Sequence, residues 1–360
     1  MSKQMVNVGY KEVFIISFIL ALVTHSLFFD IYRGAVFNIV PHDHYEYYAF
    51  YFLGDDLGKL PPQTHAYRVI AVLLALPFYY ILPLFTFSGV EPSAVDENYL
   101  RMLISFSFVT YVSVLVTCIT TYLIARKRFG VSILLATVIV LWTYLMLRHL
   151  REGLYGVDAM GVMVVTLIIY HMNNKWLYAL LVIMGVFVNE KVAMIFFMLM
   201  AGRWLFYRPR QIDIYLIAPV IALLLYAAVN IITPHFFTFS SGTGAHRDIA
   251  NFLPQFIETF MVNLTMKGII LNVIPVIILF GLYYLANMAT KYIDTGIYFR
   301  SADIVVLLGI LFISHLINVD YNVGRIAMYV FPLYLPLACI ALYQLFPSAH
   351  GLLEGQKKNV

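Results

Sequence analysis

Residues Val13–Phe29, VFIISFILALVTHSLFF, form an apolar run long enough to cross the hydrocarbon core of a bilayer as one helix. Hydrophobic residues make up 62% of the 360 residues and charged residues only 12%, where a soluble domain has about 25% charged. The run lacks an A-x-A-like cleavage site and many apolar runs follow it, so we interpret it as a retained first helix. The composition therefore predicts a polytopic membrane protein, and the net charge of +4 does not indicate nucleic-acid binding.

Helices are the natural way for such a chain to cross lipid, because each helix satisfies its own backbone hydrogen bonds. We expect an all-α bundle of about ten spans, forming a single transmembrane domain over residues 1–360. The expected spans are 13–29, 102–125, 131–147, 159–172, 176–189, 192–206, 213–232, 268–287, 303–317 and 326–346. Several are short for a bilayer, which indicates a locally thin, packed bundle or broken helices.

One further apolar stretch, 67–88, is interrupted by Pro77 and Pro83. Short cytoplasmic loops carry an excess of Lys and Arg. If 67–88 lies in the outer leaflet without crossing, the inner segments hold 13 basic and 5 acidic residues, and the outer segments 10 basic and 14 acidic residues. If it crosses, the basic cluster Arg126–Arg128 faces outward. We therefore expect a membrane-lying helix and both termini in the cytoplasm, with a full crossing as the alternative.

This arrangement leaves two long loops on the external face, 30–101 and 233–267. The first loop contains the membrane-lying stretch, and the second contains an amphipathic piece at 249–262. The two cysteines, Cys118 and Cys339, fall inside apolar stretches and suggest no disulfide framework.

The first external loop contains an acidic, aromatic motif at 41–48, PHDHYEYY. Ionisable groups near hydrocarbon are rare and usually serve a site, so we take Asp43 as the leading candidate for a general base or a metal-ligating carboxylate, with Glu46 nearby. Alternatively, Asp43 caps a helix that begins around His44. Asp43, His42 and His44 could together hold a metal ion. Structural or solvated histidines are the more common case for so short a motif.

Two arginines stand at the ends of apolar segments on the expected outer face. Arg68 opens the stretch 67–88 and either clamps a phosphate with its two-pronged guanidinium or extends towards lipid headgroups. Arg325 precedes the last apolar segment and is either an anion clamp or an interfacial anchor. Glu190 and Lys191 stand between two apolar runs with almost no loop. They either form an internal ion pair or line a polar cavity open to the outer face.

A short external loop at 148–158 carries Arg148, Arg151 and Asp158, which must lie near the first loop if the bundle is compact. Asp158 is equally placed to cap a helix that begins at Ala159. Asp30, at the end of the first apolar run, is a competing candidate acid in the first loop.

This order of elements resembles the GT-C superfamily of polytopic glycosyltransferases, which includes protein O-mannosyltransferases and lipid A aminoarabinose transferases. The resemblance rests on six short motifs: the acidic Asp43–Tyr47, the proline-led stretch 61–90, the span 100–130 that ends in a basic turn, Tyr155–Asp158, Asn189–Lys191, and Gly324–Arg325 before a proline-containing helix. Many members have Asp-Glu or Glu-Asp where this chain has Asp-His. Many also carry a soluble C-terminal domain that has no counterpart in this sequence.

The resemblance implies an inverting glycosyltransferase that takes sugar from a polyprenyl-phosphate donor at the outer membrane face and builds cell-envelope polysaccharide. Asp43 would be the catalytic base. The implied substrate-binding residues are Glu46, Arg68, Arg148, Arg151, Asp158, Glu190, Lys191 and Arg325. No cofactor is required, although a divalent metal could assist. The expected location is a bacterial inner membrane. The alternatives are a non-enzymatic carrier or an inactive assembly subunit for lipid-linked glycans.

Overall fold

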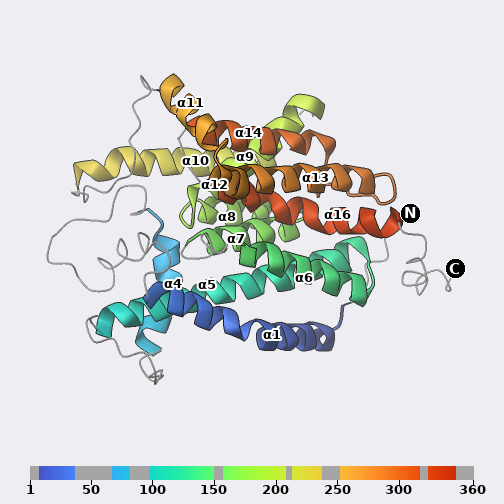
Figure 1. Ribbon diagram of the computed structural model, residues 1–360, viewed down its shortest axis with the longest axis horizontal. Coiled ribbons are helices and arrows are strands. Elements are labelled where there is room, and N and C mark those ends of the chain that lie inside the picture. Colours follow the sequence, from blue (N-terminus) through green and yellow to red (C-terminus); the bar gives the residue numbers. More distant parts are fainter. Residues whose placement is uncertain are drawn as a thin grey trace.

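The computed structural model describes residues 8–36, 67–81, 97–149, 157–207, 213–236, 252–316 and 323–345. Within these ranges every regular element is a helix and no strand is present. Figure 1 shows α1, α5, α6, α13 and α16 running along the long axis of the molecule. The expected all-α architecture is therefore confirmed for the described part of the chain.

The helices occur in the following order. They are α1 (Tyr10–Val36), α4 (Val69–Ile81), α5 (Glu97–Leu123), π-helix η2 (Ile124–Arg128), α6 (Ile133–His149), α7 (Val157–His171), α8 (Lys175–Gly185), α9 (Glu190–Tyr207) and α10 (Ile214–Ile232). After them come the 3₁₀ turn η3 (Thr233–His235), α11 (Phe252–Val262), α12 (Met266–Gly268), π-helix η5 (Ile269–Val273) and α13 (Ile274–Ala289). The chain continues through η6 (Ser301–Asp303), α14 (Ile304–Leu316), α15 (Val323–Ala327), η8 (Met328–Val330) and α16 (Phe331–Leu345).

Each of the ten predicted apolar segments overlaps a helix, and the amphipathic piece at 249–262 contains α11. Five helical stretches in the described residues are long and apolar enough to cross a membrane: Tyr10–Arg33, Leu100–Arg128, Ile214–His235, Met266–Ala289 and Met328–Leu345. The remaining apolar helices are shorter; α7 has 15 residues and α8 has 11. The structure is thus that of an integral membrane protein, and the count of ten spans stays a prediction.

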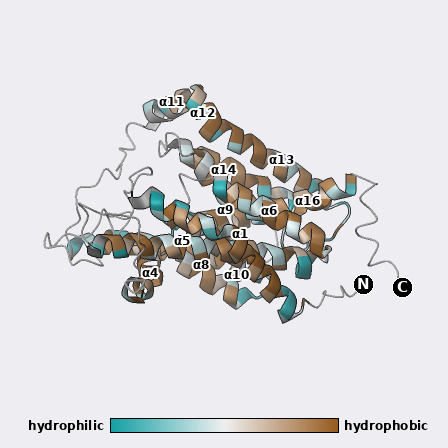
Figure 2. Ribbon diagram, turned by 60° about the horizontal axis from the view of Figure 1, so that its bottom comes forward, coloured by the Kyte–Doolittle hydropathy of each residue, from teal (hydrophilic) through white to brown (hydrophobic). Residues whose placement is uncertain are grey.

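The pattern of burial is that of a bundle surrounded by lipid. The apolar windows of α5 and α16 are 67% and 78% buried, whereas those of α1, α10 and α13 are only 17–22% buried although they are equally apolar or more so. Figure 2 shows that α10 and α13 consist mostly of hydrophobic residues. Polar side chains inside α5 are satisfied locally, since Ser113, Thr117 and Thr121 each donate a hydrogen bond to the carbonyl four residues earlier.

Helix α4 lies across its neighbours instead of alongside them. In Figure 1 it crosses the direction of α1 and α5, and in Figure 2 it is seen nearly end-on. Its first turn is fixed to the turn before α9, because the Ile70 amide donates to the Phe187 carbonyl over 3.3 Å. The residue before α4, Arg68, is buried.

Two ion pairs join helix ends on the side of the bundle away from the start of α9. Arg126 Nε lies 2.8 Å from Glu12 Oε1, which joins η2 to the start of α1. Arg203 in α9 holds Asp303 with Nε–Oδ1 and Nη2–Oδ2 distances of 2.7 Å each, and it also donates to the carbonyls of Ile297 and Tyr298. Guanidinium groups with this many acceptors stabilise fixed turns, and these turns belong to segments expected in the cytoplasm.

Candidate functional site

Side chains from four parts of the chain converge at the N-terminal ends of α4, α7 and α9 and in the turn just before α16. This polar cluster consists of Arg68, Asp158, Asn189, Glu190, Lys191 and Tyr329. Asn189 precedes α9 and is fully buried, while Tyr329 lies in η8. Chain reversals between apolar helices therefore bring the charged groups together.

The first half of the cluster is the pair formed by Arg68 and Glu190. Arg68 Nη2 lies 3.0 Å from Glu190 Oε1, and Arg68 Nε lies 3.3 Å from Oε2, so both carboxylate oxygens are engaged. The side chains are 7% and 22% exposed, respectively. A two-pronged contact of this kind is geometrically specific, and here it ties the start of α4 to the first residue of α9.

The second half is centred on the Asp158 carboxylate. Its Oδ1 accepts hydrogen bonds from Lys191 Nζ and Asn189 Nδ2, each over 3.2 Å, and from the hydroxyl of Tyr329. Asn189 Nδ2 also donates to the Tyr329 hydroxyl over 2.9 Å. The Lys191 ammonium lies 5.4 Å from the centre of the Tyr329 ring, within the range of a cation–π contact. The Asp158 side chain is 7% exposed and the Lys191 side chain 18%.

A glycine in α7 makes room for the ring of Tyr329. A Cβ atom added at Gly161 in α7 would lie 2.6 Å from Tyr329 Cε1, so only glycine leaves space for the ring at this point. Asp158 and Gly161 are three residues apart on α7 and share one face of the helix. The ring and the carboxylate are thus held together by the same helix face.

Among the side chains that the structure describes here, two cations face two carboxylates. Of the two interpretations for Glu190 and Lys191, the structure shows ion pairing, with different partners for each residue. Breaking one such pair leaves an uncompensated charge, which costs about 3–5 kcal/mol when the pair is buried. The Glu190 and Lys191 side chains are 22% and 18% exposed, so the cluster is not completely enclosed.

The position of the cluster along α9 gives its expected depth in the membrane. Glu190 and Arg203 are thirteen positions apart on α9, which corresponds to about 20 Å of helix. The hydrocarbon core of a bilayer is about 30 Å thick. If the Arg203–Asp303 pair is at the inner surface, the polar cluster reaches into the outer part of the membrane.

Other predicted site residues lie elsewhere. Arg148, at the end of α6, is 3.8 Å from Asp30 of α1, and both side chains are about half exposed. The structure thus pairs Arg148 with the competing acid of the first loop and does not bring it into the polar cluster. Asp158 does not precede its helix as a capping residue would, because α7 already begins at Val157.

Several predictions fall on parts that the structure does not describe. Asp43, Glu46 and Arg151, together with His42 and His44, lie outside the described residues. Arg325 belongs to α15, one turn before Tyr329, and its side chain is likewise outside the description. In the part of the chain that is described, no group of three or more His, Cys, Asp or Glu residues could hold a metal ion.

Tyr329 is the cluster member that the sequence did not single out. It is one of 27 tyrosines, and 171 positions separate it from Asp158, so no local motif marks it. Comparison with protein-family models, with curated proteins and with solved structures found no match.

Proposed function

We propose that this chain is a membrane glycosyltransferase of the GT-C type, which moves a sugar from a polyprenyl-phosphate donor to an acceptor at the outer membrane face with inversion. The observation that supports it most is the polar cluster, where buried and partly buried cations and carboxylates at the starts of α4, α7 and α9 meet beside Tyr329. Charged groups at membrane depth are costly and usually belong to a functional site.

The proposed topology has ten spans, both termini in the cytoplasm, and α4 lying in the outer leaflet of a bacterial inner membrane. The crossed orientation of α4 in Figure 1 supports this arrangement, as do the ion-paired turns of Arg126 and Arg203 at the ends expected inside. The short α7 and α8, with 15 and 11 residues, fit a locally thin bundle.

In the proposed chemistry, Asp43 accepts the proton of an acceptor hydroxyl as that oxygen attacks the anomeric carbon. The bond between this carbon and the phosphate oxygen breaks, and polyprenyl phosphate leaves with the electron pair. Because the leaving group is a phosphate, it needs a nearby cation more than a strong acid. Arg68 or Arg325 supplies this cation, while Glu46, Arg148, Arg151, Asp158, Glu190 and Lys191 orient the substrates. A divalent metal at Asp43, His42 and His44 is an optional aid.

A non-enzymatic role, as a carrier or inactive assembly subunit for lipid-linked glycans, is the second candidate. It is favoured by the two ion pairs described in the polar cluster, where Glu190 engages Arg68 and Asp158 engages Lys191. An enzyme of the proposed kind must release one of these cations to the phosphate, whereas a scaffold need not.

The experiment is to incubate purified protein with a panel of radiolabelled polyprenyl-phosphate sugars, with and without divalent metal, and to measure sugar release and donor binding. Wild type is compared with Asp43→Asn and with Asp213→Asn, a change at an exposed acid on the start of α10. Turnover that is lost only in Asp43→Asn supports the proposal. Donor binding without turnover by the wild type under all conditions supports the carrier or subunit instead.

A further inference from the structure

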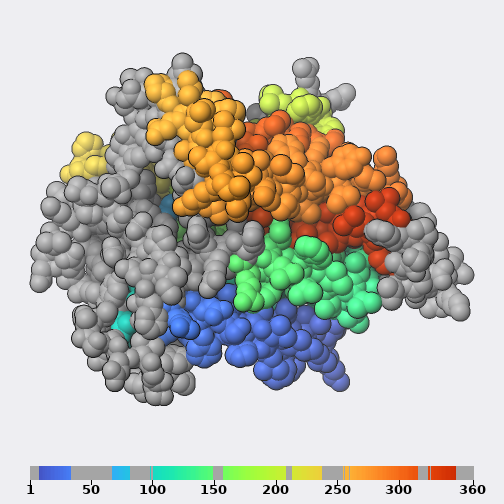
Figure 3. All heavy atoms as spheres, in the orientation of Figure 1, coloured from blue at the N-terminus to red at the C-terminus, as the bar shows by residue number. Residues whose placement is uncertain are grey.

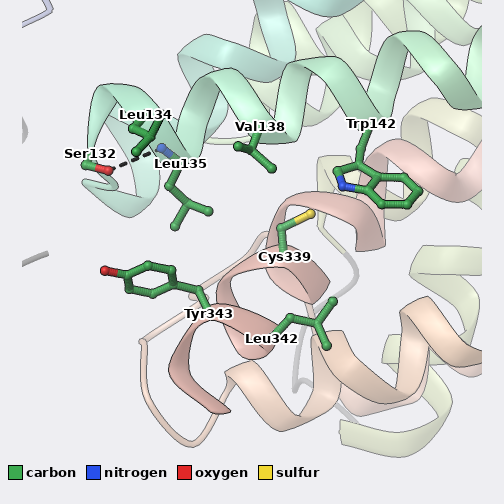
Figure 4. Close-up of a pocket in the computed structure, with 8 residues that line it drawn as sticks. All are labelled: Ser132, Leu134, Leu135, Val138, Trp142, Cys339, Leu342 and Tyr343. Atoms are coloured by element: carbon green, nitrogen blue, oxygen red, sulfur yellow. Dashed lines mark hydrogen bonds between the residues drawn. The ribbon is translucent and has the colours of Figure 1, made fainter. Parts of the chain in front are cut away.

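A groove between α6 and α16 lies away from the polar cluster and has no part in the proposed reaction. Its volume is about 250 Å³, and Figure 4 shows its lining: Ser132, Leu134, Leu135, Val138, Trp142, Cys339, Leu342 and Tyr343. Small-molecule sites usually have volumes of roughly 300–1,000 Å³. The groove is therefore closer to the size of a single hydrocarbon chain than to that of a bulky ligand.

The groove belongs to the lipid-facing surface. Leu134 and Trp142, on its α6 side, are 53% and 52% exposed, and Leu342, on its α16 side, is 41% exposed. Figure 3 shows α6 at the surface between α1 and α16. In a membrane the outer face of these helices meets hydrocarbon, so a chain from the bilayer has direct access to the groove.

The two ends of the groove differ in polarity. Figure 4 shows Ser132 and the Tyr343 hydroxyl towards one end and Trp142 at the other, with the Cys339 sulfur between the two helices. Ser132 Oγ accepts a hydrogen bond from the Leu135 amide over 3.2 Å and so caps the first turn of α6. The groove thus has a polar entrance and an apolar far end.

Positive charge is concentrated beside the polar entrance. Arg126 Nη1 donates to the carbonyl of Val131, the neighbour of Ser132, over 2.5 Å. Arg126 belongs to the basic π-helix η2, which also contains Lys127 and Arg128. The carboxylate of Glu12 offsets one of these three charges through Arg126. Lys127 and Arg128 face α7, where the Lys127 ammonium lies 3.5 Å from the Tyr170 hydroxyl and Arg128 donates to the Ile169 carbonyl over 3.0 Å. These neutral acceptors leave the two positive charges uncompensated, so η2 as a whole favours an anionic headgroup at this end of the bundle.

We propose that the groove binds one acyl chain of an anionic phospholipid from the leaflet at this end, with its phosphate beside η2. The polyprenyl donor is a poorer occupant, because its phosphate is expected at the polar cluster. Tyr329, in that cluster, lies fourteen positions before Tyr343, which corresponds to about 20 Å along the helix. The head of the donor and the polar entrance of the groove are therefore at opposite ends of α16.

The test uses the full-length protein in phosphatidylcholine nanodiscs that contain a small amount of a phospholipid with a diazirine in one acyl chain. Phosphatidylglycerol and phosphatidylcholine probes with identical chains are compared. After illumination, mass spectrometry locates the cross-linked residues. We expect the phosphatidylglycerol probe to label the peptides of Val138 and Cys339 several-fold more than the phosphatidylcholine probe, with unlabelled phosphatidylglycerol competing.

Two matched variants locate the effect. Val138→Trp fills the groove and should remove the preferential labelling. Leu141→Trp adds the same ring to an exposed position on α6 outside the groove and should leave it unchanged. Equal labelling by both probes would overturn the proposal, as would labelling spread evenly over α10 and α13 or stronger competition by polyprenyl phosphate. The comparison of probes on the wild type decides the question even if Val138→Trp fails to fold.

Discussion

The pairing of Asp158 with Lys191 gives the sharpest prediction of stability. We consider Asp158→Asn, Lys191→Met and the double variant. Each single change leaves one charged group of the pair in a largely buried position, since the wild-type side chains are only 7% and 18% exposed. The double change removes both charges and retains an amide that can accept from Asn189 and Tyr329.

The expected magnitude follows from this burial. Removing one partner of a buried ion pair destabilises a protein by about 3–5 kcal/mol. Because the Lys191 side chain is partly exposed, we expect a value near the lower end, about 3 kcal/mol for each single variant. The double variant should cost less than the sum of the two, with a coupling free energy of about 2 kcal/mol. Lys175 and Asp213 provide the control, because this 3.0 Å pair is about half exposed and should give a coupling below about 1 kcal/mol.

The assay is reversible unfolding in mixed micelles by titration with sodium dodecyl sulfate, followed by circular dichroism. Asp213→Asn is suitable for the control cycle, because asparagine can still cap α10. If the Asp158 and Lys191 effects add to within about 0.5 kcal/mol, the two charges do not stabilise one another and the described contact has no energetic role.

Three further predictions concern packing, the attachment of α4 and topology. Gly161→Ala should cost about 1–3 kcal/mol in the same titration by forcing the tyrosine ring of the polar cluster to move, whereas Gly281→Ala, with nothing within 4 Å of the added carbon, should cost nothing measurable. Arg68→Lys retains the charge but loses the two-pronged contact, so protease cleavage near the start of α4 should be faster than in wild type, and an unchanged rate would contradict the attachment. In a cysteine-free chain, a cysteine at Lys291 should react with a membrane-impermeant maleimide only from the cytoplasmic side and one at Met266 only from the outer side. Reaction of both from one side would contradict the topology.

The helices were predictable because apolar length alone determines where a membrane helix forms. Segment 213–232 matches α10 closely, and segment 268–287 matches the continuous helical stretch Met266–Ala289. Whether a helix crosses was less predictable, since it depends on tilt and neighbours. The predicted span 176–189 contains an α8 that ends at Gly185, because the next residues turn to place Asn189 and Glu190 at the start of α9.

The site was predictable only in part, because the sequence marks charges and not their partners. Glu190 and Lys191 were recognised as needing partners near lipid, and Arg68 was interpreted as a phosphate clamp or a headgroup anchor. Arg68 and Glu190 are 122 positions apart, however, and nothing local joins them. The capping interpretation of Asp158 was wrong for a similar reason: it considered only the chain next to Asp158, whereas the carboxylate bonds to groups from α9 and η8. The role of Asp43 remains a prediction, since the residue lies outside the described part of the chain.

The central claim is that the protein breaks the bond between sugar and lipid phosphate. The most direct measurement is a product balance in oriented proteoliposomes that hold a polyprenyl-phosphate sugar labelled in both the sugar and the lipid, with an acceptor outside. The account predicts equal amounts of transferred sugar and free polyprenyl phosphate, with both absent in Asp43→Asn. Intact sugar-lipid that moves between leaflets without release of polyprenyl phosphate would contradict it and identify a carrier.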